Sequence, residues 1–168
     1  NLVCLDSAGK TKSLATKTKI VWQQANSTTT GDVVSAVKLE NTTLKVTTTG
    51  KTGNAVVAIT NDNDQIVWSY HIWVGEANDI SYTNTAKGTF KLMDRNLGAT
   101  STTIKDRNSY GLFYQWGRKD PFARNLVVER PTGSPYESAV SDLQKSEEAT
   151  SETGTIAYAI RNPQTRLL

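Results

Sequence analysis

The carboxylates of this 168-residue chain are the first residues to consider for catalysis. Glycoside hydrolysis needs two carboxyl groups about 5 to 9 Å apart, one acting as an acid and the other as a base or nucleophile. The candidates for such a pair are Asp94, Asp106, Asp120 and Glu129. Nothing in their spacing places two of them at that distance, so they do not predict an enzyme.

His71 is the only histidine, and a Ser-His-Asp or Cys-His arrangement would have to be built on it. It lies in the middle of an expected strand, between Tyr70 and Ile72, and the chain has no G-x-S-x-G nucleophile motif. We therefore predict a structural or interdomain histidine rather than a catalytic one.

Residues that could hold a metal are sparse. Cys4 is the only cysteine, which excludes an intrachain disulfide and a cysteine metal cluster. The run Asn61 to Asp64 offers oxygen ligands for calcium, but it lacks the glycine and the downstream glutamate of an EF-hand loop. A polar hairpin turn is the favoured interpretation, because Asn and Asp tolerate left-handed backbone, and metal binding there stays open. No cofactor and no metal site are predicted.

The stretch YGLFYQWGRKDPF, residues 110–122, combines aromatic rings with charge and has two interpretations. In the first, it binds a ligand, and Tyr114, Trp116 and Arg118 line a pocket that stacks on a sugar or peptide. In the second, arginines pair with nearby carboxylates and bond loop carbonyls where regular backbone bonding is missing. The residues of this structural clasp are Asp94, Arg95, Asn96 and Asp120, with Arg118 as the second arginine.

Helical spacing favours the structural interpretation. Three apolar side chains have the i, i+3, i+4 spacing of a buried helical stripe: Leu112, Phe113 and Trp116. Asn108 or Ser109 can cap this helix, and Gly117 suits its end. The side chains then most free to reach solvent are Tyr110, Tyr114 and Gln115.

The elements around these residues are expected to be mainly β. Clustered threonines suit half-exposed strands, and short strands separated by turn signals over residues 1–76 predict an immunoglobulin-like β-sandwich. A first hairpin is expected between residues 33–39 and 44–48. Its predicted cross-strand pairs are Leu39 with Leu44 and Val37 with Val46.

A second hairpin is expected between residues 54–60 and 65–74. Its predicted pairs are Ile59 with Ile66 and Val57 with Trp68. The face that carries these residues continues through three more, which are also predicted to be core: Tyr70, Ile72 and Val74. The opposite face is predicted to be partly exposed or interdomain, and it carries Val67, Ser69, His71 and Trp73.

The polar, turn-rich residues 77–88 are expected to be a linker, followed by an α+β domain over residues 89–168. Strands are predicted at residues 89–93 and at Thr155–Ile160. Residues 132–155 are rich in Ser, Thr, Gly and Glu and predict a mobile loop with a short helix at Glu137–Ser146.

The charge pattern argues against nucleic acid as a partner. The net charge is +3 and the pI near 9.0, but the basic residues are scattered among acidic ones and form no patch. Nucleic-acid binding is therefore not predicted, since it needs clustered positive charge. No stretch approaches the ~18 apolar residues of a transmembrane segment.

Two long motifs carry a resemblance to a known family. The first is NAVVAITNDNDQIVWSYHIWV, residues 54–74, and the second joins KLMDRNLGAT, residues 91–100, to YGLFYQWGRKDPF. Their order resembles a module of fimbrillin-family and related cell-surface proteins of gut anaerobic bacteria, in which an all-β segment leads into a FISUMP-type (major paralogous) domain. The resemblance covers roughly residues 17–123.

The resemblance implies two domains. Residues 1–76 would be the immunoglobulin-like sandwich, and residues 89–168 a FISUMP-type α+β domain similar to a C-type-lectin-like fold. Family members usually continue into a cysteine-containing D-P-C-P-x-G-x-R-V-P segment that this sequence lacks. Either the chain is truncated there or its second domain is atypical. The family supplies no catalytic residues to transfer.

We therefore expect a non-enzymatic bacterial cell-surface or secreted protein, on the exterior of the outer membrane, that serves adhesion, fimbrial assembly or ligand binding. Its partners would be other surface or pilus subunits, or host and glycan ligands. The alternative is a carbohydrate-binding module or a component of a polysaccharide-acting enzyme. That alternative would need a cleft with two close carboxylates, or exposed aromatic rings in a row.

Overall fold

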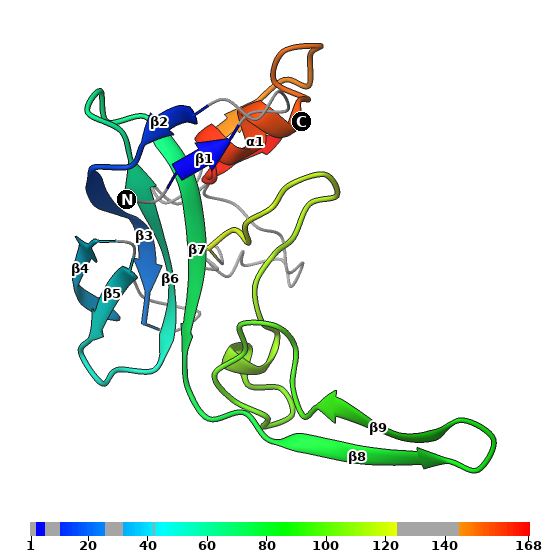
Figure 1. The fold of residues 1–168 in the computed structure, drawn as a ribbon. Helices are drawn as coiled ribbons and strands as arrows, with labels where there is room; N and C mark the ends of the chain where they lie inside the picture. Colours follow the sequence, from blue (N-terminus) through cyan, green and yellow to red (C-terminus); the bar gives the residue numbers. More distant parts are fainter. Residues whose placement is uncertain (1–2, 6–10, 26–31, 42, 124–144) are drawn as a thin grey trace, which may run out of the picture.

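The computed structural model describes residues 3–5, 11–25, 32–41, 43–123 and 145–168, which form a mainly β protein as predicted (Figure 1). All strand pairs among them are antiparallel except the parallel pair β10–β11. The strands are β1 Val3–Leu5, β2 Thr11–Leu14, β3 Lys17–Gln24, β4 Val34–Glu40, β5 Thr43–Thr48, β6 Gly53–Thr60, β7 Ile66–Val74, β8 Asp79–Asn84, β9 Gly88–Met93, β10 Lys145–Glu147 and β11 Thr165–Leu167. The helices are the 3-10 turn η1 Arg107–Ser109 and α1 Ile156–Arg161.

The centre of the molecule is a three-stranded sheet in the order β3-β6-β7. All eight residues of β6 are buried, including five consecutive apolar ones from Ala55 to Ile59. A continuous apolar run of this kind is typical of a strand that is covered on both faces. The fold is therefore built around one strand that needs a cover on each side.

The β4–β5 hairpin covers one face of this sheet. Val34 packs with Ala55 and Val57 of β6, and partly buried side chains close around them: Ile20, Val37, Leu44, Val46 and Ile72. The predicted register of this hairpin is confirmed, since Leu39 pairs with Leu44 and Val37 with Val46.

The irregular segment 94–123 covers the other face. Ala123 joins Trp22 of β3 and Val56 of β6 in a buried cluster, and Leu112 packs against it. Successive residues of β6 thus point alternately to the hairpin and to this segment, as the period of a strand requires. The cluster joins residues from both sides of the expected linker.

The predicted register of the second hairpin is wrong. Ile59 pairs with Trp68 rather than Ile66, and Val57 pairs with Tyr70 rather than Trp68. Two features shift the register by one position each: the turn has five residues, Asn61 to Gln65, instead of the expected four, and a β-bulge lies at the turn end of the ladder, where Thr60 pairs with Ile66 and Val67 is the extra residue. A bulge of one residue cannot be read from a regular alternation of apolar residues.

The predicted core face of β7 is also wrong in part. Trp68 is 38% exposed and Tyr70 37%, whereas Ser69 on the opposite face is only 2% exposed. Ser69 is covered because its hydroxyl bonds Asp120 of the irregular segment. The face predicted to be mixed therefore carries the contact with the second half of the chain.

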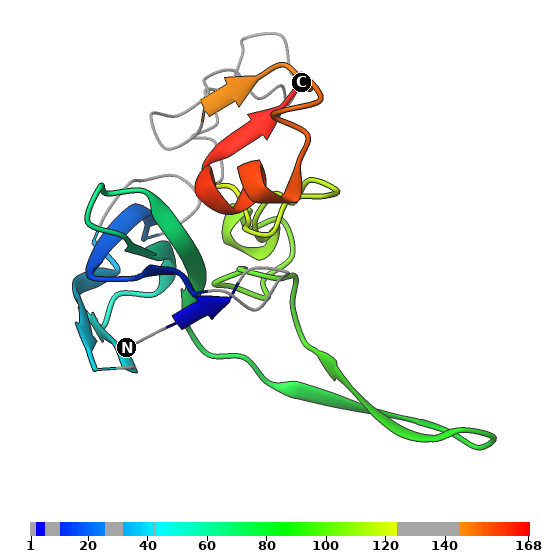
Figure 2. The same cartoon turned by 45° about the horizontal axis from the view of Figure 1, so that its top comes forward.

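Residues 79–84 of the expected linker form strand β8, which pairs with β9 in six consecutive positions. The predicted strand at residues 89–93 lies within β9. These two strands leave the body of the protein as a long arm (Figures 1 and 2).

The predicted helix over residues 110–116 is not formed. In this part of the chain, helical geometry is confined to η1, which is capped by the side chain of Asp106 and ends before Tyr110. Gly111 has a φ of +78°, and the next amide, Leu112 N–H, donates to the carbonyl of Leu97. A Cβ at Gly111 would lie 2.5 Å from that carbonyl oxygen. Close packing at a left-handed residue therefore turns the chain away from a helix.

The elements predicted near the C-terminus differ as well. Residues 156–161 form helix α1 instead of the predicted strand, because the Thr155 hydroxyl caps it by accepting from Tyr158 N–H. Of the predicted loop over residues 132–155 and its helix Glu137–Ser146, residues 132–144 lie outside the described residues. Lys145 and Ser146 belong to strand β10 rather than to a helix.

Two glycines allow the packing at Gly111 to be tested. Gly111→Ala is expected to lower the free energy of unfolding by about 3 kcal/mol, because it combines left-handed strain with a clash. Gly117→Ala is the matched control: its φ is +77°, but no atom lies within 4 Å of the added Cβ. We expect it to cost about 1 kcal/mol. Equal losses in urea unfolding would contradict the packing argument.

Candidate functional site

Trp116 lies at the tip of a tight turn. Arg118 N–H donates to the carbonyl oxygen of Gln115 over 3.0 Å, and Gly117 at the third position has a φ of +77°. A positive φ at this position is the signature of a type II turn. The indole at the second position is fully exposed to solvent. The prediction that Trp116 belongs to a buried stripe is therefore wrong.

Both flanks of this turn are bonded to the C-terminal segment. The Gln115 amide donates to the carbonyl of Leu167 over 2.7 Å and accepts from Leu167 N–H over 2.9 Å. Arg118 donates to the carbonyl of Asn162 over 2.7 Å and lies 5.8 Å from the centroid of the Tyr158 ring. Trp116 is thus an exposed aromatic residue on a fixed backbone.

The other aromatic residues of the stretch surround this turn unevenly. Tyr114 is about half exposed, and partial burial raises the pKa of its hydroxyl. Phe113 is exposed in part and forms an isolated β-bridge with the buried Phe122. Burial also lowers the pKa of Arg118. Trp116 and Tyr114 are therefore the accessible members of the predicted ligand set, while Arg118 contacts Asn162 and Tyr158.

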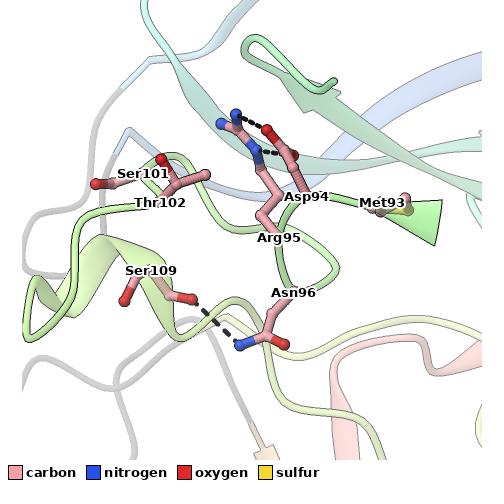
Figure 3. A pocket seen from close by; sticks show the side chains of 7 residues that line it. All are labelled: Met93, Asp94, Arg95, Asn96, Ser101, Thr102 and Ser109. Carbon is pink, nitrogen blue, oxygen red and sulfur yellow. Dashed lines mark hydrogen bonds and ion pairs between the residues drawn. The ribbon is translucent and has the colours of Figure 1, made fainter. Parts of the chain in front are cut away.

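A polar pocket of about 320 Å³ opens beside the base of the β8–β9 arm. Its lining residues are Met93, Asp94, Arg95, Asn96, Ser101, Thr102 and Ser109 (Figure 3). Three of the four predicted clasp residues gather here, together with hydroxyl groups that the sequence did not single out. Hydroxyl, amide and charged groups of this kind can bond a hydroxylated ligand.

Asp94 and Arg95 form the charged wall of this pocket. Arg95 Nε and Nη2 donate to the two Asp94 carboxylate oxygens over 2.7 and 2.8 Å (Figure 3). This bonding lowers the pKa of Asp94 to about 2, with help from the Asn78 backbone and side chain. The Asp94 backbone N–H also donates to Asn78 O. Asp94 is therefore an ionised group that joins the start of β8 to the end of β9 at the base of the arm.

The predicted clasp residue Asn96 and a residue of β6 hold the loop around the pocket. Asn96 donates to Ser109 O over 3.2 Å. Asn54 of β6 donates to Gly98 O over 2.8 Å, and its side-chain oxygen lies 3.0 Å from His71 Nε2. Since the amide oxygen of Asn54 can only accept, the proton of this hydrogen bond lies on His71 Nε2.

The fourth predicted clasp residue, Asp120, lies elsewhere, against the central sheet. It is 3% exposed, accepts from the Ser69 hydroxyl over 2.7 Å and pairs with Lys119 over 2.8 Å. Lys119 also donates to Ser69 O and lies 4.6 Å from the centroid of the Trp68 ring. This charged pair anchors the irregular segment to β7.

The carboxylates that were candidates for catalysis accept hydrogen bonds from neighbouring groups of the protein. Asp94 is bonded to Arg95, Asp106 accepts from Asn108 N–H at the start of η1, and Asp120 is bonded to Ser69 and Lys119. Glu129 lies outside the described residues.

The run Asn61 to Asp64 forms the turn between β6 and β7. Asn61 accepts from the backbone N–H groups of Asn63 and Gln65, and Asp64 has a φ of +59°. Its carboxylates accept from neighbouring side chains, Asp62 from Thr16 and Asp64 from Lys17. Among the described residues, no three His, Cys, Asp or Glu side chains gather as a metal site.

Several residues that build these sites were not predicted. Gln115 was assigned to solvent, yet its amide bonds both backbone groups of Leu167. The sequence did contain a signal for Ser69, because a small polar residue in an apolar strand indicates a buried hydrogen bond. Asn54 and Lys119 gave no such signal, and the partners that they bond lie more than 40 residues away in the sequence.

Comparisons with protein families, curated proteins and solved structures returned no match. In the described part of the chain, neither helix has the length and apolar character needed to cross a membrane.

The pH dependence of stability tests the state of His71. Burial lowers its pKa below the ordinary value of 6.5, with a smaller opposing effect from Asp120. The unfolded chain then binds a proton more readily than the folded one, so stability is full above pH 6.5 and falls as the pH drops toward the folded pKa. His71→Gln, which keeps a donor for Asn54, should lose this decrease in urea unfolding between pH 7.5 and 5. A slope that persists in the variant would contradict this assignment, because no other histidine titrates there.

Proposed function

We propose that this protein is a non-enzymatic bacterial cell-surface protein, outside the outer membrane or secreted, that serves adhesion, fimbrial assembly or ligand binding. The observation that carries the proposal is the exposure of Trp116 on a turn whose two flanks are bonded to the C-terminal segment. Because the backbone that carries this ring is already fixed, stacking of a ligand orders only the side chain of Trp116 and needs no ordering of the loop. Tyr114 extends the same surface.

The resemblance to fimbrillin-family and FISUMP-type proteins supports this proposal through the same residues, because YGLFYQWGRKDPF contains the Trp116 turn. Under this proposal, residues 1–76 form an immunoglobulin-like sandwich and residues 89–168 a FISUMP-type α+β domain of C-type-lectin-like kind. The packing of the β4–β5 hairpin on the central sheet supports the two-layered character of the first part.

A second candidate is a carbohydrate-binding module or a component of a polysaccharide-acting enzyme. Two observations favour a carbohydrate ligand: the exposed ring of Trp116, and the pocket lined by Ser101, Thr102, Ser109 and Asn96. Sugars offer an apolar face for stacking and hydroxyl groups for hydrogen bonds. The structural bonds of Asp94, Asp106 and Asp120 favour binding over hydrolysis.

A glycan array with the purified chain tests the proposed ligand-binding role of Trp116. We expect binding to at least one class of glycan, and Trp116→Ala should weaken it at least about tenfold in a fluorescence titration with that glycan. The matched control is Ile104→Ala, which also removes a highly exposed apolar side chain and should leave affinity unchanged.

Two outcomes would contradict the proposal. Equal affinity of Trp116→Ala and the unchanged chain, with equal unfolding curves, would remove the role of Trp116. Turnover of the bound glycan that stops in a folded Asp106→Asn variant would favour the enzyme instead.

A further inference from the structure

The β8–β9 arm has one apolar and one polar face. Directly paired residues lie on the same face of an antiparallel ribbon, and the pairs Ile80 with Leu92 and Tyr82 with Phe90 form the apolar one. The opposite face is polar apart from Met93 at the base, which pairs with Asp79; it carries Ser81, Lys91 and a hydrogen bond between Thr83 and Thr89.

The apolar face is open to solvent. Its four side chains are 45 to 56% exposed. Within the described residues β8 and β9 pair only with each other, and both views show them projecting from the body (Figures 1 and 2). A two-stranded ribbon is marginally stable by itself in water. A contiguous apolar face on such a ribbon marks a site of association.

We propose that the apolar face of this arm binds the same face of a second copy of the chain, with the two arms antiparallel about a two-fold axis. Along the arm, the central pair Ser81–Lys91 lies between the aromatic pair Tyr82–Phe90 and the aliphatic pair Ile80–Leu92. A two-fold axis that passes through this central position places the aromatic pair of one copy on the aliphatic pair of the other. A two-fold interface of this kind uses one patch twice.

The charges at the two ends of the arm favour this antiparallel arrangement. The exposed Glu76 lies at the base, two residues after the last residue of β7, and the exposed Lys87 lies in the turn at the tip. Glu76 is five residues before Ser81, and Lys87 is four residues before Lys91. The two charges are therefore nearly equidistant from the central pair, and the two-fold axis brings each Lys87 to the partner's Glu76. A parallel stack would oppose like charges instead.

The available area predicts a weak dimer. Four half-exposed side chains offer on the order of 100 Å² each, so two copies would bury about 800 Å². Stable interfaces bury about 1,200 to 2,000 Å², and smaller ones are transient. We expect a dissociation constant of about 10 to 100 µM.

Analytical ultracentrifugation between 1 and 500 µM tests this interface. The chain should change from monomer to dimer over this range, and Leu92→Lys should weaken dimerisation at least about tenfold. Thr89→Lys is the matched control, because it adds the same charge to the polar face of the same strand, and it should dimerise like the unchanged chain.

Charge variants keep the test valid if Leu92→Lys unfolds the arm. Lys87→Glu should raise the dissociation constant about threefold to tenfold, and the double variant Lys87→Glu with Glu76→Lys should restore it. A carbodiimide that joins carboxylate directly to amine should link Glu76 to Lys87 in a species of dimer mass. Within one arm these residues are separated by a strand of about 20 Å, so the link must form between copies.

Three outcomes would overturn the proposal. They are a monomer at 500 µM, equal dimerisation of Leu92→Lys and Thr89→Lys, and a monomeric chain that binds phosphatidylcholine–phosphatidylglycerol vesicles through this face. The interface does not depend on the Trp116 turn. Trp116→Ala is expected to dimerise like the unchanged chain, so this proposal and the proposed ligand-binding role can fail separately.

Discussion

The burial of β6 on both faces is the constraint on which the rest of the structure depends. Its five consecutive apolar residues have no solvent side, so each face of the central sheet must be covered by another part of the chain. The β4–β5 hairpin supplies one cover by regular cross-strand packing. The second comes from residues 94–123, which have little regular structure, and Leu112 and Ala123 are its contacts with the sheet.

An irregular cover has to be fixed by side chains, because its backbone groups lack the partners that a sheet or helix provides. Asn54 bonds Gly98 O from one side of the sheet, and Asp120 bonds Ser69 on β7. Gln115 and Arg118 bond the C-terminal segment in the same manner. These inward bonds leave Trp116 as the outward residue of the turn. The charged and amide residues of the motif are therefore structural, and that bonding is what exposes the ring between them.

The parts of the fold that depend on local pattern could be predicted from the sequence. The β4–β5 register follows from the alternation of Val37 and Leu39 with Val46 and Leu44. The bulge at Val67 and the loss of a helix at Gly111 could not be predicted, because each depends on a contact that the pattern does not encode. Helix α1 did have a local signal, the N-cap residue Thr155, but the apolar run that follows it equally suits a strand. Gly111 illustrates the limit, since a helical spacing of apolar residues was overridden by its close approach to Leu97 O. For the site, the sequence locates the motif, but its favoured structural interpretation puts Trp116 in a buried stripe and Gln115 in solvent, whereas the ligand-binding interpretation includes Trp116 among the pocket residues.

The apolar face of the arm and the Trp116 turn differ in how they are supported. The Trp116 turn is held by hydrogen bonds to Leu167 and Asn162, so its conformation exists before any ligand arrives. The arm is held by its own cross-strand bonds and by Asp94 at its base, which bonds Arg95 and Asn78. Burial of an apolar face adds stability to whatever element carries it. A contact on the arm would therefore also stabilise the arm, whereas a contact on Trp116 would use a backbone structure that is already complete.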